Sequence, residues 1–132
     1  MQQQLSKPAR WTGRVLSGIV ILFMVTDALF KFLITPEAVE ATAQLGYEQH
    51  HFIPMGVLAL TCTLLYAIPR TAILGAVLMS AYYGGAIATH FRVDNPLFSH
   101  MLFPVYLAVL MWGGLWLRDR TLQQVFPFKT TN

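Results

Sequence analysis

The residues best suited to chemistry in this sequence are ionisable side chains that lie inside or beside long apolar segments. Asp27 and Lys31 share one apolar segment, while His90, Arg92 and His100 fall within eleven residues at the junction of two others. A charged group inside a membrane span is costly and by default indicates function. Histidine titrates near neutral pH, so we expect these groups to bind a ligand by hydrogen bonds or to transfer protons.

We hypothesise that Asp27, His90 and His100 converge on one pocket, with Tyr83 as a further lining residue. The competing explanation is structural, because Asp27 precedes Lys31 by four residues, the order that favours an ion pair on one helix face. Lys31 is also expected to extend its ammonium group to the membrane surface. Two histidines and an aspartate could hold a metal, but no HxxxH or HxxE spacing on one helix supports this, and no metal site is predicted.

The composition places these groups in a membrane protein. Residues of the AVILMFWYC class make up 55% of the 132 residues and charged residues 11%, against about 25% charged in soluble domains. The charged residues, with a net charge of +3, cluster between the apolar runs. The sequence has no basic stripe interleaved with aromatic residues, the pattern that would indicate nucleic-acid binding. The single cysteine, Cys62, excludes an internal disulfide and a CxxC redox pair.

Membrane-spanning helices must position the polar groups, because four apolar segments come near the roughly 20 residues that a bilayer requires. They predict an all-α fold, a four-helix transmembrane bundle. The bundle is expected to occupy residues 12–117, with spans at about 12–33, 52–68, 72–91 and 96–117, between tails at 1–11 and 118–132.

A short helix is predicted between the first two spans, at residues 36–45. Thr35 is a suitable N-cap, Pro36 suits the first helical position, and Glu37 suits the positive end of the helix dipole. Gly46 is a suitable stop. This segment is too short and too acidic to span, so we expect it to lie at the membrane interface and cover the pocket.

Pro104 interrupts the fourth apolar segment. Proline has no amide hydrogen to donate to the carbonyl four residues back, which belongs to His100. We therefore expect a kink in this span, with a free carbonyl beside the His100 side chain.

Small residues recur every four positions along the third span, at Ala72, Ala76, Ser80, Gly84 and Ala88. Such a stripe allows close approach of helix backbones in lipid. We therefore expect the stripe to pack against a neighbouring helix, and a leucine at Gly84 to force the two helices apart.

The distribution of lysine and arginine predicts an orientation. With four spans, seven basic residues fall on the side that holds both termini and two on the other. Because basic residues are retained in the cytoplasm, we expect an integral protein of the cell (inner) membrane with both termini cytoplasmic. The seven are Lys7, Arg10, Arg14, Arg70, Arg118, Arg120 and Lys129, and the two are Lys31 and Arg92.

Several long segments resemble the DoxX-like membrane proteins. They are VEATAQLGY (39–47), CTLLYAIPRTAILGA (62–76), GGAIATHFR (84–92) and NPLFSHMLFPVYLAVLMWGGLWLRD (95–119). The resemblance extends from about Gly13 to Asp119 and implies a four-helix membrane bundle. Relatives in the wider group are linked to quinone-coupled sulfur oxidation and membrane redox assemblies, so the resemblance also implies a quinone-like lipophile and a redox-protein partner.

Three functions remain open at this point. The first is a non-catalytic membrane subunit that binds a lipophile such as quinone and docks a redox partner. The second is a small proton-coupled transporter or permease, which with four spans and no inverted repeat would need to form a homo-oligomer. The third is an enzyme acting on a lipid-like substrate, although the sequence contains no nucleophile–base pair, phosphate loop or cofactor motif. We favour the first.

Overall fold

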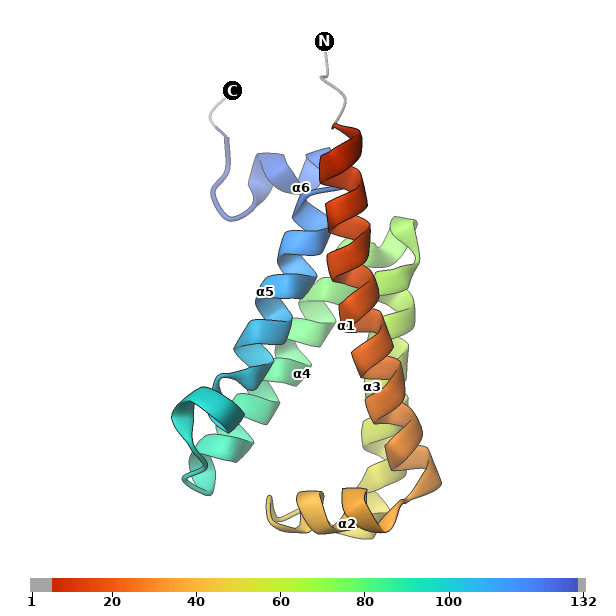
Figure 1. Ribbon diagram of the computed structural model, residues 1–132, viewed down its shortest axis with the longest axis vertical. Helices are drawn as coiled ribbons and strands as arrows, with labels where there is room; N and C mark the ends of the chain where they lie inside the picture. Colours follow the sequence, from red (N-terminus) through yellow and green to blue (C-terminus); the bar gives the residue numbers. More distant parts are fainter. Residues whose placement is uncertain (1–5, 131–132) are drawn as a thin grey trace.

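The computed structural model describes residues 6–130 and shows an all-α protein (Figure 1). Four helical segments in this range are long and apolar enough to cross a membrane. The predicted all-α, four-helix architecture is therefore confirmed. The segments are α1 (Lys7–Leu33), α3 (Phe52–Ala67) with the 3₁₀ turn Gln49–His51 before it, α4 (Ala72–Arg92) after the 3₁₀ turn Pro69–Thr71, and α5 (Phe103–Trp116) with the π-helical turn Leu97–Met101 before it.

The first helix begins earlier than expected, at Lys7. Ser6 caps it, since the Ser6 hydroxyl accepts a hydrogen bond from the amide of Ala9 at 3.2 Å. Pro8 lies in the first turn, where proline is tolerated because its missing N–H has no helical partner. The helix ends at Leu33, and Ile34 follows in the left-handed conformation.

Helix α2 (Pro36–Ala43) lies across the end of the bundle opposite the beginning of α1 (Figure 1). The Thr35 hydroxyl accepts from the amide of Ala38 at 3.3 Å, as a capping residue should. The chain leaves the helix through Gly46, whose φ of 88° is readily adopted by glycine. The helix is thus two residues shorter than the predicted segment 36–45.

Glycines allow two close helix contacts. A Cβ at Gly75 would lie 2.2 Å from the backbone nitrogen of Tyr66, so α4 touches the backbone of α3 at this position. A Cβ at Gly114 would lie 2.9 Å from the carbonyl oxygen of Gly13 and 2.6 Å from the hydroxyl oxygen of Ser17, which marks the second contact, between α5 and α1.

The small-residue stripe packs only along its first half. Ala72 and Ala76 are buried, whereas Gly84 and Ala88 are exposed. A Cβ built on Gly84 meets no atom within 4 Å. The expectation that a leucine at Gly84 would force helices apart is therefore wrong, because this face of α4 meets no neighbouring helix at Gly84.

The fourth span contains a break where a kink was predicted. The π-helical turn Leu97–Met101 ends before Leu102, and α5 starts at Phe103 with Pro104 in its first turn. Proline begins the helix here and does not bend its interior. One further helix, α6 (Arg120–Val125), was not predicted. Asp119 caps it by accepting from the amide of Leu122 at 3.0 Å.

A hydrogen-bonded chain ties three helices together near the termini. The Tyr66 hydroxyl donates to the carbonyl of Met111 at 2.6 Å. Since a hydroxyl has one hydrogen, Ser17 must donate in the 2.7 Å bond between the two hydroxyls. Arg118 in turn donates to the Ser17 oxygen at 3.3 Å. Tyr66 is thus buried with its hydroxyl fully engaged.

Candidate functional site

The ionisable residues inside the bundle line a cavity of about 430 Å³ at the end that α2 covers. We call this cavity the α2-end pocket. Helices α1, α3, α4 and α5 and the segment around α2 all contribute to it. Its lining residues include Phe23, Met24, Asp27, Lys31, Thr42, Leu45, Tyr47, Met55, Leu58, Tyr82, Tyr83, Ala86, Thr89, His90, Phe103, Pro104 and Leu107.

Asp27 and Lys31 form an ion pair in the wall of this pocket. The Lys31 ammonium donates to Oδ2 of Asp27, one helical turn away. Lys31 is only 7% exposed, so the expectation that its ammonium group would reach the membrane surface is wrong. The aspartate holds it inside the bundle. A paired carboxylate and ammonium can each still bond to a ligand, since both keep unused hydrogen-bonding capacity.

His90 lines the same pocket from α4. Its Nδ1 lies 2.8 Å from the side-chain amide nitrogen of Asn95. An amide nitrogen can only donate, so this bond assigns the proton of the neutral imidazole to Nε2 and makes that atom a hydrogen-bond donor.

His100 lies beside His90 and does not line the pocket. The two rings meet edge to face with centroids 5.8 Å apart, and Nδ1 of His100 lies 2.8 Å from the Ser99 hydroxyl. The structure therefore brings Asp27 and His90 to one pocket, while His100 reaches the pocket only through its contact with His90.

Arg92 does not line the pocket, but it holds the turn after α2 in place. Its Nη2 donates to the carbonyl of Leu45 at 2.8 Å. A Cβ at Gly46 would lie 2.6 Å from the same nitrogen, so a glycine there leaves room for the guanidinium. Arg92 thus fastens the turn after α2 to the end of α4.

Two lining residues were missed from the sequence. Thr89 donates to the carbonyl of Gly85 at 2.8 Å, so the Tyr47 hydroxyl must be the donor in its 3.0 Å bond to Thr89. This bond joins the loop after α2 to α4. No periodic signal marks Tyr47, which lies in a loop, and the contact spans 42 residues of sequence.

Tyr83 occupies the wall of the pocket with an unused hydroxyl. It is 3% exposed, and its hydroxyl has no hydrogen-bond partner within residues 6–130. Buried polar atoms are nearly always paired. This side chain therefore has a donor and an acceptor to offer to a molecule bound beside it.

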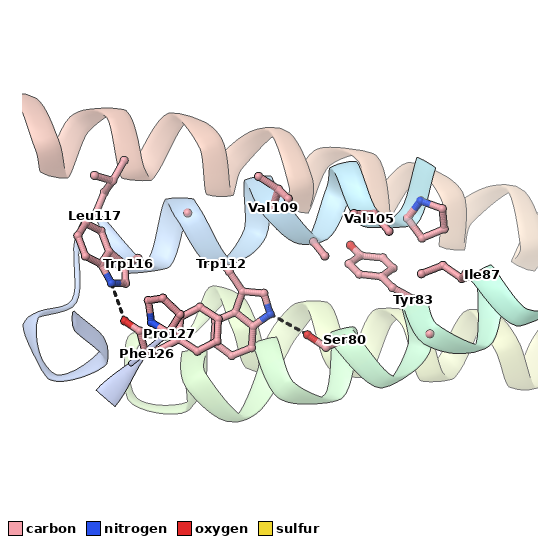
Figure 2. A pocket seen from close by; sticks show the side chains of 14 residues that line it. Ser80, Tyr83, Ile87, Val105, Val109, Trp112, Trp116, Leu117, Phe126 and Pro127 are labelled. Carbon is pink, nitrogen blue, oxygen red and sulfur yellow. Dashed lines mark hydrogen bonds between the residues drawn. The ribbon is translucent and has the colours of Figure 1, made fainter. Parts of the chain in front are cut away.

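A second cavity, of about 670 Å³, lies between α4 and α5 (Figure 2). We call it the α4–α5 groove. Trp112 crosses the groove, and its Nε1 donates to the Ser80 hydroxyl at 2.8 Å. Phe126, after α6, stacks on Trp112 with ring centroids 4.6 Å apart, and its carbonyl accepts from Nε1 of Trp116 at 2.9 Å. The last part of the chain thus closes one end of the groove.

The α2-end pocket is the candidate site because it combines an apolar wall with hydrogen-bonding groups. Its apolar side chains suit the hydrocarbon part of a ligand, and Asp27, Lys31, His90 and Tyr83 suit a polar head. No group of three or more histidine, cysteine, aspartate or glutamate side chains placed to hold a metal ion occurs within residues 6–130.

Comparison with known proteins gives one match. The model of the DoxX-like family matches residues 15–114, which is more than half of the chain and includes every residue that lines the α2-end pocket. No curated protein and no solved structure matches the chain. The chain belongs to the DoxX-like family of membrane proteins.

Proposed function

We propose that this protein is a non-catalytic membrane subunit that binds a quinone-like lipophile in the α2-end pocket. One observation supports the proposal above the others: an apolar cavity in a membrane bundle carries the Asp27–Lys31 ion pair on α1 and the side chains of Tyr83 and His90 on α4. A quinone has a flat apolar ring with two carbonyl acceptors. Lys31, Nε2 of His90 and the Tyr83 hydroxyl are donors of the kind that such carbonyls require.

The proposal includes a redox-protein partner. Reduction of a quinone to a quinol takes up two electrons and two protons. His90, which lines the pocket, is the side chain there that can pass protons to this reaction. The electrons require a donor of another kind, which we assign to a redox protein docked on this subunit.

Native mass spectrometry of gently solubilised protein tests this function. We expect the protein to carry a bound lipophile that is released on unfolding and shows the absorbance change of a quinone on reduction with borohydride. Protein that has lost this lipophile by unfolding and has been refolded in detergent should bind one molecule of decylubiquinone per chain. Refolded protein that takes up no decylubiquinone would contradict the proposal.

A small proton-coupled transporter is the second candidate, because the Asp27–Lys31 pair and His90 share one cavity. Proton relays in membranes use such side chains. Proteoliposomes separate the two functions. The proteoliposomes are loaded with a pH-sensitive dye, and a substrate gradient is imposed across their membrane. A proton-coupled transporter should then lower the internal pH, whereas a binding subunit should leave it unchanged.

We further propose that the protein resides in the inner membrane with both termini in the cytoplasm. The seven-to-two distribution of basic residues supports this orientation. In a Cys62→Ala background, Thr130→Cys should resist an impermeant thiol reagent in intact cells, and Glu48→Cys should react with it. Labelling of Thr130→Cys without disruption of the cells would refute the orientation.

A further inference from the structure

The α2-end pocket and the α4–α5 groove share a wall. Tyr83 and Pro104 line both cavities. Figure 2 shows the Tyr83 side chain reaching from α4 toward α5 beside Val105, in the part of the groove between Ile87 and Trp112. The Tyr83 side chain and the first turn of α5 therefore lie between the two cavities.

Nothing in residues 6–130 holds the Tyr83 hydroxyl by a hydrogen bond. Tyr66 has a similar depth of burial, but its hydroxyl bonds to both Ser17 and Met111. A buried hydroxyl without a partner is costly, and in native proteins a bound molecule is one of the few explanations for it. Reorientation of the Tyr83 hydroxyl hydrogen breaks no hydrogen bond, so the hydroxyl is available to a ligand.

The two cavities differ in chemistry in the way that the two ends of an amphipathic lipid differ. The pocket carries the ion pair Asp27–Lys31 and His90. The groove is lined mainly by carbon atoms. Among its polar side chains, Trp112 bonds to Ser80 and Trp116 bonds to the carbonyl of Phe126, which leaves the Tyr83 hydroxyl unpaired within residues 6–130. A polar head fits the first, and a hydrocarbon chain fits the second.

We propose that the pocket and the groove bind a single amphipathic molecule, with its carbonyl-bearing head in the α2-end pocket, its hydrocarbon chain in the α4–α5 groove, and the Tyr83 hydroxyl donating to a head oxygen where the molecule passes between α4 and α5. This inference rests on the proposed function and extends it. The pocket takes the ring, and the groove selects ligands that carry a long apolar chain.

Two probes with the same head separate the contributions of the cavities. Decylubiquinone carries a ten-carbon chain, and 2,3-dimethoxy-5-methyl-1,4-benzoquinone has the same ring without a chain. Their affinities can be measured by quenching of tryptophan fluorescence in lipid nanodiscs. The wild-type protein should bind both, and the chain should strengthen binding at least about tenfold.

Gly84→Leu tests the groove. A Cβ at Gly84 meets no atom within 4 Å, so the leucine fills the groove without disturbing the fold. We expect this variant to bind decylubiquinone as weakly as the chain-free probe, with the affinity for the chain-free probe unchanged. Gly18→Leu is the matched control, since Gly18 has the same open surroundings and lines neither cavity. Unchanged affinity for decylubiquinone in Gly84→Leu would overturn the inference. If the wild-type protein proves to be an oligomer and Gly84→Leu a monomer, a second copy fills the groove and the inference fails as well.

Tyr83→Phe tests the hydroxyl. We expect both probes to bind about tenfold more weakly, while the melting temperature of the ligand-free protein stays equal or rises, since an unpaired polar atom is removed. Tyr66→Phe should do the opposite, lowering the melting temperature and leaving both affinities unchanged. If Tyr83→Phe keeps full affinity for both probes, the inference fails while the proposed function stands. If the wild-type protein binds neither probe, the proposed function fails as well.

Discussion

Gly75→Leu is expected to prevent stable folding of the bundle. A Cβ at this position would lie 2.2 Å from the backbone nitrogen and 2.5 Å from the Cα of Tyr66. Backbone atoms of α3 cannot move aside as a flexible side chain can, so α4 must separate from α3 along the hairpin. The loss should exceed the roughly 1–3 kcal/mol typical of an overpacked core. The yield of monodisperse protein and its melting temperature in detergent measure the effect.

Gly84→Leu serves as the control on the same helix. The substitution is chemically the same, but the new side chain enters open space. We expect wild-type yield and a melting temperature that is unchanged or slightly higher, because leucine has a better helix propensity than glycine. Equal losses in the two variants would contradict the helix orientation described above.

The second large effect is expected from the ion pair. Asp27→Ala leaves the Lys31 ammonium without its partner in a side chain that is only 9% exposed. A lysine or aspartate at the centre of a membrane helix costs about 2.5–3.5 kcal/mol on the mildest scale. Because Lys31 lies in the last turn of α1, we expect the free energy of unfolding to fall by up to about this amount, as measured by reversible denaturation in mixed micelles, and the affinity for ligand to fall with it.

A double-mutant cycle separates pairing from binding. Asp27→Ala with Lys31→Met removes both charges, so much of the stability lost in Asp27→Ala should return, since contacting residues are not additive. Glu37→Ala is the control, because Glu37 is exposed on α2 and should change little. If the double variant regains stability and still fails to bind decylubiquinone, the pair belongs to the binding site. If Asp27→Ala is as stable as the wild type, the pair contributes nothing to the fold.

Much of the fold was predictable because its signals are local. Apolar length marks the four spans, and the capping residue Thr35 with Pro36 marks the start of α2. These features depend on residues within one turn of each other. Helix α6 was missed because its six residues show no helical period of apolar side chains. The contact that holds the following segment against α5, the stacking of Phe126 on Trp112, joins residues that are distant in sequence, so no local pattern indicates it.

The rotation of α4 was not predictable from its small residues. The four-residue spacing of the stripe is regular in sequence, but which glycine meets a backbone depends on where the neighbouring helices lie. Gly75, next to Ala76 of the stripe, meets α3, while Gly84 faces open space. Spacing shows that a close contact is allowed and does not show where it occurs.

The candidate site was predictable in part for the same reason. Charge inside an apolar span identified Asp27 and Lys31, and both line the α2-end pocket with His90 and Tyr83. His100 lies near the same end of the bundle, but the π-helical turn places its ring against His90 and outside the pocket lining. The Tyr47–Thr89 contact joins a loop to a helix, and no local pattern in the sequence indicates it.

Photoaffinity labelling gives the most direct test of the α2-end pocket as the binding site. A ubiquinone analogue with an azido group on its ring should, on illumination in native membranes, label peptides that contain Asp27–Lys31 and Tyr82–His90, which line the pocket. Excess decylubiquinone should remove the label. Labelling confined to exposed membrane-facing residues such as Leu22, Val57 and Leu74, and unaffected by the competitor, would contradict the proposed function.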